Sequence, residues 1–89
     1  MSAEGKREGR VVQVIGPAVD IEFPGGELPE IYNAVSIYFG DEGMSFYGKD
    51  HITVEVAQHL GENRVRTIAM EPSDVLVRGM KAVDTGGSI

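Results

Sequence analysis

Short runs rich in Val and Ile, separated by Gly and Pro, extend along this chain and constrain its fold more than any other feature. No long segment keeps the hydrophobic period of about 3.6 residues that marks a helix. One stretch shows the strand pattern best, because Val19, Ile21 and Phe23 alternate with Asp20 and Glu22. This period of two is typical of a strand with one face buried. The sequence therefore predicts an all-β protein.

The same pattern predicts six strands, at residues 10–15, 18–23, 34–39, 52–58, 64–70 and, for a last short strand, 80–83. The turn residues between them include Gly16-Pro17 and Gly61-Glu62-Asn63. Gly, Pro and Asn interrupt strands at such positions. Closing a sheet removes its exposed edge strands, so six short antiparallel strands favour a small closed barrel over an open sandwich.

Length and composition exclude several functions. The 89 residues allow one domain, and a net charge of −6 argues against nucleic acid, which binds through clustered Lys and Arg. The absence of cysteine excludes disulfides, thiolate zinc sites and cysteine nucleophiles. No run reaches the roughly 18 apolar residues of a membrane span, and the start, MSAEGKREG, lacks the apolar core of a signal peptide. We expect a soluble cytoplasmic protein without direct membrane insertion.

The segment GMSFYGKD, residues 43–50, resembles a phosphate-binding loop up to its last position, where Asp50 replaces the Ser or Thr that holds magnesium. A phosphate loop needs a Gly-rich turn that leads into a helix. Here Phe46 and Tyr47 interrupt the turn, and the following HITVEV has the pattern of a strand. We therefore interpret the segment as part of a hairpin.

The segment KAVDTGGS, residues 81–88, contains the Asp-Thr-Gly sequence of aspartic proteases, some of which are small all-β homodimers. Such a protease would pair Asp84 with the aspartate of a second copy, and it needs further strands and a flap to cover the substrate. Only five residues follow Asp84. We expect no substrate groove there, and the protease is the less favoured enzyme alternative.

The histidines and acidic residues predict no metal site. On one extended strand, His51 and His59 would lie roughly 27 Å apart, at about 3.4 Å per residue, so they cannot share a metal. We interpret both as surface residues of a strand. Four acidic residues lack the spacing of a calcium loop and predict a solvated face. These are Asp20, Glu22, Glu27 and Glu30.

Three stretches together carry a family resemblance: GRVVQVIGPAVDIEFP at 9–24, EVAQHLGENRVRTIAM at 55–70 and LVRGMKAVDTGGSI at 76–89. In order and spacing they resemble the amino-terminal barrel of the catalytic β subunit of the rotary F-type ATP synthase, a six-stranded barrel. The α-subunit barrel and the flagellar and vacuolar ATPase barrels are weaker matches, because EVAQHLGE and VRTIAM are typical of β.

This resemblance implies a structural role. In the F-type head, α and β barrels join side by side into a ring that keeps six subunits together while the lower domains open and close. The parent complex couples proton translocation to ATP synthesis and is peripheral to the inner face of the membrane. The partners implied are α-subunit barrels in a hetero-hexameric ring, whereas the isolated chain would be a monomer. A stand-alone binding module is the remaining alternative.

The resemblance also implies a division of the chain. A flexible segment would occupy 1–8, the barrel 9–84 and a tail 85–89, after which the nucleotide-binding domain would follow. The phosphate loop of the family lies in that later domain. We therefore expect no catalytic residue, cofactor site or metal site in this chain.

Two features depart from the family pattern. Val75 stands where β subunits usually carry Gly, and Val disfavours a positive φ, so a conserved turn shape would strain it. The segment 36–50 is longer than the usual hairpin of the family and adds Met44, Phe46 and Tyr47. We expect these apolar side chains to cap a barrel end or to dock a partner.

Overall fold

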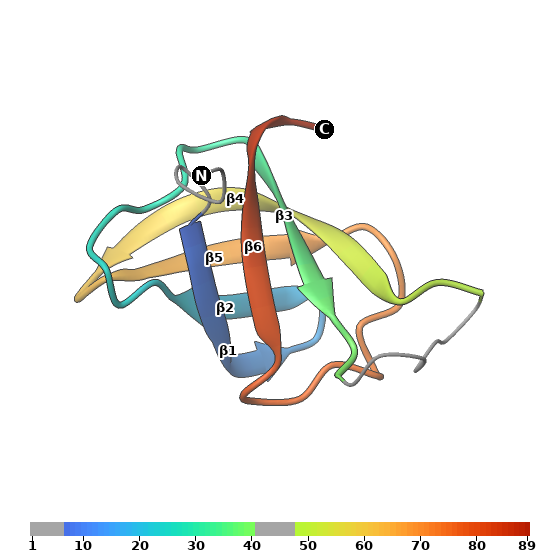
Figure 1. Cartoon of the computed structure of the whole chain (residues 1–89). Coiled ribbons are helices and arrows are strands. Elements are labelled where there is room, and N and C mark those ends of the chain that lie inside the picture. Colours follow the sequence, from blue (N-terminus) through green and yellow to red (C-terminus); the bar gives the residue numbers. More distant parts are fainter. Residues whose placement is uncertain (1–6, 41–47) are drawn as a thin grey trace.

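The computed structural model describes residues 7–40 and 48–89, which form six strands around one core (Figure 1). The strands are β1 (Arg7–Ile15), β2 (Ala18–Glu22), β3 (Asn33–Tyr38), β4 (His51–Gly61), β5 (Arg64–Ala69) and β6 (Lys81–Ser88). All neighbours pair antiparallel, and the sheet closes in the order β1-β2-β5-β4-β3-β6. The predicted six-stranded closed barrel is confirmed, and the open sandwich is wrong.

Alternation along the strands fills the barrel with apolar side chains. Ile52, Val54 and Val56 were predicted to share one face of their strand, and all three are buried. The polar Thr67 lies among the core residues and donates its hydroxyl to the carbonyl of Val19 at 2.8 Å. Removal of the apolar core side chains from water is the main source of stability. The core consists of Val11, Val19, Ile21, Phe23, Val35, Ile37, Phe39, Ile52, Val54, Val56, Val65, Leu76 and Ala82.

Two tight turns join neighbouring strands where the sequence predicts them. Gly16, with a φ of 57°, begins the turn from β1 to β2. Glu62 and Asn63 connect β4 to β5 with φ values of 56° and 64°. Two positive φ angles in a two-residue hairpin match the right-handed twist of the strands. The described residues form no helix, and hence none that is long and apolar enough to cross a membrane.

The first and last strands are longer than the sequence pattern predicts. β1 begins at Arg7 rather than at residue 10, and Arg7 pairs with Asp84 of β6. β6 continues to Ser88 rather than ending at residue 83, and Ser88 pairs with Asn33 of β3. These extensions contain polar and Gly residues without apolar alternation. Backbone pairing with neighbouring strands, rather than burial of apolar side chains, therefore makes them strands.

The positive φ that would strain Val75 is not present in this structure. Among the described residues, the non-Gly positions with positive φ are Tyr32, Glu62 and Asn63. Val75 is not among them, and its partly buried side chain packs against the core. The positive φ in this loop, 93°, belongs to Gly79 instead. The apolar residues Met44, Phe46 and Tyr47 lie outside the described residues.

We expect Val75→Gly to lower the free energy of unfolding by about 1–2 kcal/mol, because it removes packed methyl groups and adds freedom to the unfolded chain. Val77 in the same loop is 57% exposed. Val77→Gly shares the entropic cost but not the loss of packing, so it is the matched control. It should lower the free energy of unfolding less than Val75→Gly does. Urea unfolding of both variants gives the comparison. A stability equal to or above that of the parent chain for Val75→Gly would contradict the packing role.

Gly9 of β1 lies where the neighbouring strand leaves no room for a side chain. A Cβ atom built there runs into the carbonyl oxygen of Glu22 and lies 3.0 Å from the ring of Phe23. Overpacking of this kind costs about 1–3 kcal/mol, so we expect Gly9→Ala to lower the urea midpoint clearly. Gly25→Ala is the control, because a Cβ at Gly25 meets no atom within 4 Å. Equal midpoints for the two variants would refute the close packing at Gly9.

Candidate interaction surfaces

The segment that resembles a phosphate loop leads directly into a strand. Of residues 43–50, the structure describes Gly48, Lys49 and Asp50, which precede β4. The Lys49 ammonium binds the Glu71 carboxylate at 2.7 Å. Asp50 lies 2.7 Å from Nδ1 of His51, and this hydrogen bond lowers the pKa of Asp50. The predicted strand is confirmed, so Lys49 does not stand before a helix whose first N–H groups would bind phosphate.

Asp84, from the Asp-Thr-Gly segment, holds three strands together at one end of the barrel. Its side chain is buried and accepts hydrogen bonds from Nη1 of Arg7 at 2.7 Å, Nδ2 of Asn33 at 3.2 Å and the backbone N–H of Gly86 at 2.9 Å. The hydrogen bond to Asp84 raises the pKa of Arg7. A protease aspartate shares a proton with a second aspartate and faces the substrate. The buried Asp84 instead pairs with the partly exposed Arg7 at the end of the barrel, which is the geometry of a structural residue.

We expect Asp84→Asn to lower the free energy of unfolding by about 1–3 kcal/mol, because the amide loses the charge that Arg7 pairs with inside the barrel. The exposed Asp74 belongs to a loop, and Asp74→Asn makes the same chemical change without disturbing a buried contact. Thermal unfolding at neutral pH compares the two variants. If both leave the midpoint unchanged, Asp84 does not hold the strands together.

Of the four acidic residues predicted to form a solvated face, Asp20 is the one that is buried. Only 6% of it is exposed, although it lies on the outer wall of the barrel. Nε and Nη2 of Arg66 donate to its two oxygens at 2.8 and 2.9 Å, and Gln13 donates at 3.4 Å. The hydrogen bond to Asp20 raises the pKa of Arg66. Neighbouring side chains on β1 and β5 therefore cover Asp20, whereas Glu27 and Glu30 are exposed as predicted.

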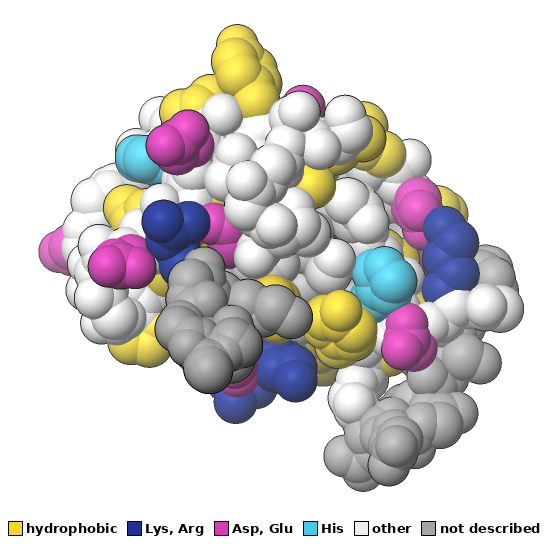
Figure 2. All heavy atoms as spheres, turned by 45° about the horizontal axis from the view of Figure 1, so that its top comes forward, with side chains coloured by type: hydrophobic (Ala, Val, Ile, Leu, Met, Phe, Trp, Pro, Cys, Tyr) yellow, Lys and Arg dark blue, Asp and Glu magenta, His cyan; other side chains and the backbone are white. Residues whose placement is uncertain are grey.

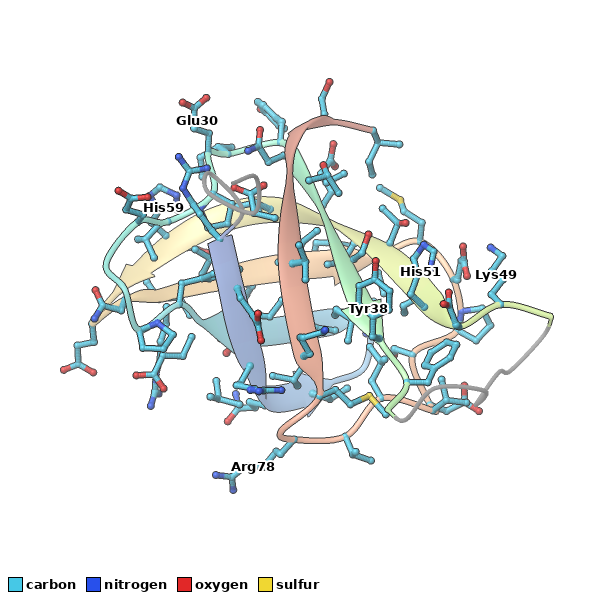
Figure 3. The ribbon with its side chains drawn as sticks, in the orientation of Figure 1. Glu30, Tyr38, Lys49, His51, His59 and Arg78 are labelled. Atoms are coloured by element: carbon cyan, nitrogen blue, oxygen red, sulfur yellow. The ribbon has the colours of Figure 1, made fainter. Side chains whose placement is uncertain are left out.

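The two histidines lie at opposite ends of β4 (Figure 3). His59 bonds the carbonyl of Pro29 through Nε2 at 2.7 Å, and the ring of His51 lies 5.2 Å from that of Tyr38. Their interpretation as surface strand residues is confirmed, because both retain exposed area. Across residues 7–40 and 48–89, no three His, Asp or Glu side chains gather into a group suited to a metal ion.

An exposed apolar surface crosses β1, β2 and β5. Ile15 pairs with Ala18, which pairs in turn with Ile68, so the three side chains point to the same side of the sheet. Met70 follows two residues after Ile68 and is 61% exposed, as is Ile15. A hollow of about 120 Å³ separates Ile15 and Ala18 from the Asp20–Arg66 pair. We call Ile15, Ala18, Ile68 and Met70 the apolar wall.

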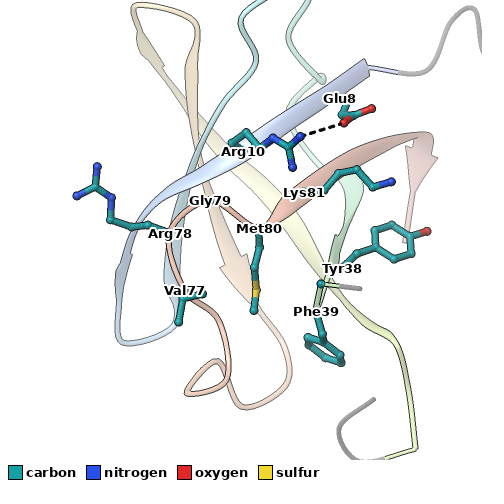
Figure 4. Close-up of a pocket in the computed structure, with 10 residues that line it drawn as sticks. Glu8, Arg10, Tyr38, Phe39, Val77, Arg78, Gly79, Met80 and Lys81 are labelled. Atoms are coloured by element: carbon teal, nitrogen blue, oxygen red, sulfur yellow. Dashed lines mark ion pairs between the residues drawn. The ribbon is translucent and has the colours of Figure 1, made fainter. Parts of the chain in front are cut away.

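The second surface is an open groove of about 610 Å³ between the start of β6, the end of β3 and β1 (Figure 4). Among the described residues that line it, Arg10, Arg78 and Lys81 are cations and Glu8 is the one carboxylate. Oε2 of Glu8 lies 3.7 Å from Nη2 of Arg10. The Lys81 ammonium lies 5.5 Å from the centre of the Tyr38 ring. We call this surface the cationic groove, after its three basic side chains.

Most of the other described basic side chains are in ion pairs, and Arg64 is the exception. On the face shown in Figure 2, acidic and basic side chains are interspersed. Elsewhere Arg7, Lys49 and Arg66 each have a carboxylate oxygen within 2.8 Å. Within the described ranges, neither Arg78 nor Lys81 forms an ion pair. Two of the three cations of the groove are therefore available to an external anion.

Comparison with known families identifies the barrel. The model of the ATP synthase alpha/beta family, beta-barrel domain, matches residues 11–86, which is most of the chain. The chain belongs to this family. The match runs from the middle of β1 into β6, and it agrees with the closed barrel that the strands form. The ATP synthase barrel domain is the non-catalytic part of α and β subunits that assemble into hexameric rings, and the match does not distinguish α from β.

Sequence reasoning alone missed both surfaces of this ATP synthase barrel. The apolar wall joins residues from β1, β2 and β5, and the groove joins residues from β1, β3 and the loop before β6. One available sign was the cluster Arg78 and Lys81, which places two of the eight basic residues three positions apart. The contribution of Arg10 depends on the pairing of β1 with β6, which no local pattern indicates.

Proposed function

We propose that this chain is a structural assembly domain that holds neighbouring ATP synthase subunits side by side in a ring. The observation that supports this best is the match of the β-barrel domain over residues 11–86, together with the closed six-stranded sheet. A closed barrel has no free edge strand to pair with a partner, so its contacts use side chains on the outer wall. Such a barrel stays rigid while attached domains move.

We assign the barrel to the β subunit, next to α-subunit barrels in a hetero-hexameric ring. The stretch EVAQHLGENRVRTIAM at 55–70 supports this assignment, because it resembles β more closely than α. In that setting the complex couples proton translocation to ATP synthesis at the cytoplasmic face of a membrane. Nucleotide binding and catalysis belong to the central domain of the subunit, and the barrel contributes neither.

The apolar wall is the lateral contact that we propose. Ile15, Ile68 and Met70 are among the large apolar side chains that the fold leaves exposed, and they gather on adjoining strands. Burying them stabilises a contact by roughly 25 cal/mol per Å² of apolar surface. The rigid Asp20–Arg66 pair beside them restricts which partner surface fits. We expect a contact through the apolar wall of one barrel to bury less than the roughly 1,200 Å² of a stable interface, so a single contact is weak.

We expect the isolated chain to be a monomer at micromolar concentration and to associate measurably when an α-subunit barrel is added. The net charge of −6 makes identical copies repel, whereas unlike barrels can present complementary surfaces. Ile15→Asp should weaken the mixed association about tenfold, because it places a charge in the apolar contact. Sedimentation equilibrium of the chain alone and of the mixture measures both effects.

Tyr32→Asp is the matched control for Ile15→Asp. Tyr32 is 67% exposed, lies away from the apolar wall in the loop before β3, and has a φ of 77° that Asp tolerates. It also adds one negative charge, so it should leave the association nearly unchanged. A tight homodimer or homohexamer of the chain alone would contradict the assembly model. Equal losses for the two variants would place the contact elsewhere on the barrel.

A further inference from the structure

We propose that the cationic groove binds a carboxylate-bearing peptide segment of a partner protein. The groove and the apolar wall both include residues of β1 but share no residue, so we treat this binding as separate from lateral assembly. Its basic residues come from β1, from the start of β6 and from the loop between β5 and β6. Arg78 lies at the end of the barrel opposite to the C-terminus (Figures 1 and 3).

The arrangement of Arg10 and Lys81 is the first argument. The two residues are direct partners in the ladder between β1 and β6. Like charges in this position are destabilising, because their side chains share one face of the sheet. Two carboxylates offset part of the charge of Arg10, namely Glu8 and Glu22, its partner on β2. Lys81 has no carboxylate partner among the described residues. A bound anion would relieve this repulsion.

The loop that carries Arg78 is the second argument, because hydrogen bonds fix it beside Arg10. The backbone N–H of Gly79 donates to the carbonyl of Val11 at 2.8 Å, and the N–H of Val11 donates to the carbonyl of Met80 at 3.0 Å. These bonds hold the loop against β1. The backbone next to Arg78 is therefore fixed against β1, while the exposed Arg78 side chain points away from Lys81 (Figure 4).

The groove has apolar as well as charged lining, and this favours a peptide over a nucleic acid. Val77, Met80 and Phe39 line it next to the cations, and Val77 is 57% exposed. A short acidic peptide with an apolar residue among its carboxylates matches both features. A long polyanion would instead meet the field of a chain with net charge −6, which repels it beyond the groove. A short segment carries fewer charges outside the groove, so its carboxylates can bind the cations with less of this repulsion.

Fluorescence anisotropy with a labelled peptide tests the proposal. The probe is a short peptide with several Glu residues around a central Phe and Leu, and it is titrated with the 89-residue chain at low salt. We expect saturable binding that weakens as salt is added, because the contacts are solvent-exposed ion pairs. The double variant Arg78→Gln/Lys81→Gln should weaken the affinity about tenfold.

Two controls separate the groove from general electrostatics. In the peptide control, Gln replaces every Glu, and this peptide should not bind. In the protein control, Arg64→Gln removes an exposed cation that lies on β5 outside the groove, and it should change the affinity less than about twofold. A single-stranded DNA oligonucleotide of similar charge is the third probe.

Lys81→Glu distinguishes loss of binding from loss of folding. It turns the like-charge pair with Arg10 into an opposite-charge pair, so the thermal midpoint should stay the same or rise while peptide binding falls. A folded Lys81→Glu variant that binds the acidic peptide as well as the parent chain would overturn the proposal. Three other results would also overturn it. These are no saturable binding by the parent chain, a loss of affinity in Arg64→Gln equal to that in Arg78→Gln/Lys81→Gln, and tighter binding of the oligonucleotide than of the peptide.

Discussion

Closure of the sheet is the constraint on which the rest of this structure depends. It requires β6 to pair on both sides, with β1 and with β3, although β1 and β6 lie at opposite ends of the sequence. Asp84 of β6 stabilises this junction, because it accepts hydrogen bonds from Arg7 of β1 and Asn33 of β3. The same Asp-Thr-Gly segment that suggests a protease in the sequence thus has a structural task in the fold.

All six strands contribute buried apolar side chains to the core of the barrel. Gly9 illustrates how closely the strands pack, since even a Cβ atom there meets the carbonyl of Glu22. The two candidate surfaces both lie on the outside of the barrel. This agrees with membership of the ATP synthase alpha/beta barrel family, whose subunits form rings.

The outer surface is divided between two regions of different chemistry. The apolar wall lies over β1, β2 and β5, and the strand order places β3 on the opposite side of the barrel from β2. The cationic groove lies where β1, β3 and β6 meet at one end. Because the two regions share no residue, lateral assembly and the binding of an acidic peptide need not compete. A rigid barrel suits both tasks, since neither surface needs the fold to open.

The sequence by itself determined the fold class, the number of strands and the family. Local alternation, as in Val19, Ile21 and Phe23, is a property of neighbouring residues, and so are turns such as Gly61-Glu62-Asn63. Only the tertiary structure decided the role of residues whose partners are distant in sequence. Asp20 is buried because Arg66 and Gln13 cover it, Val75 packs against the core, and Arg10 faces Lys81 because β1 pairs with β6. Strand pairing is a long-range choice, so a pattern of nearest neighbours cannot indicate which charges meet.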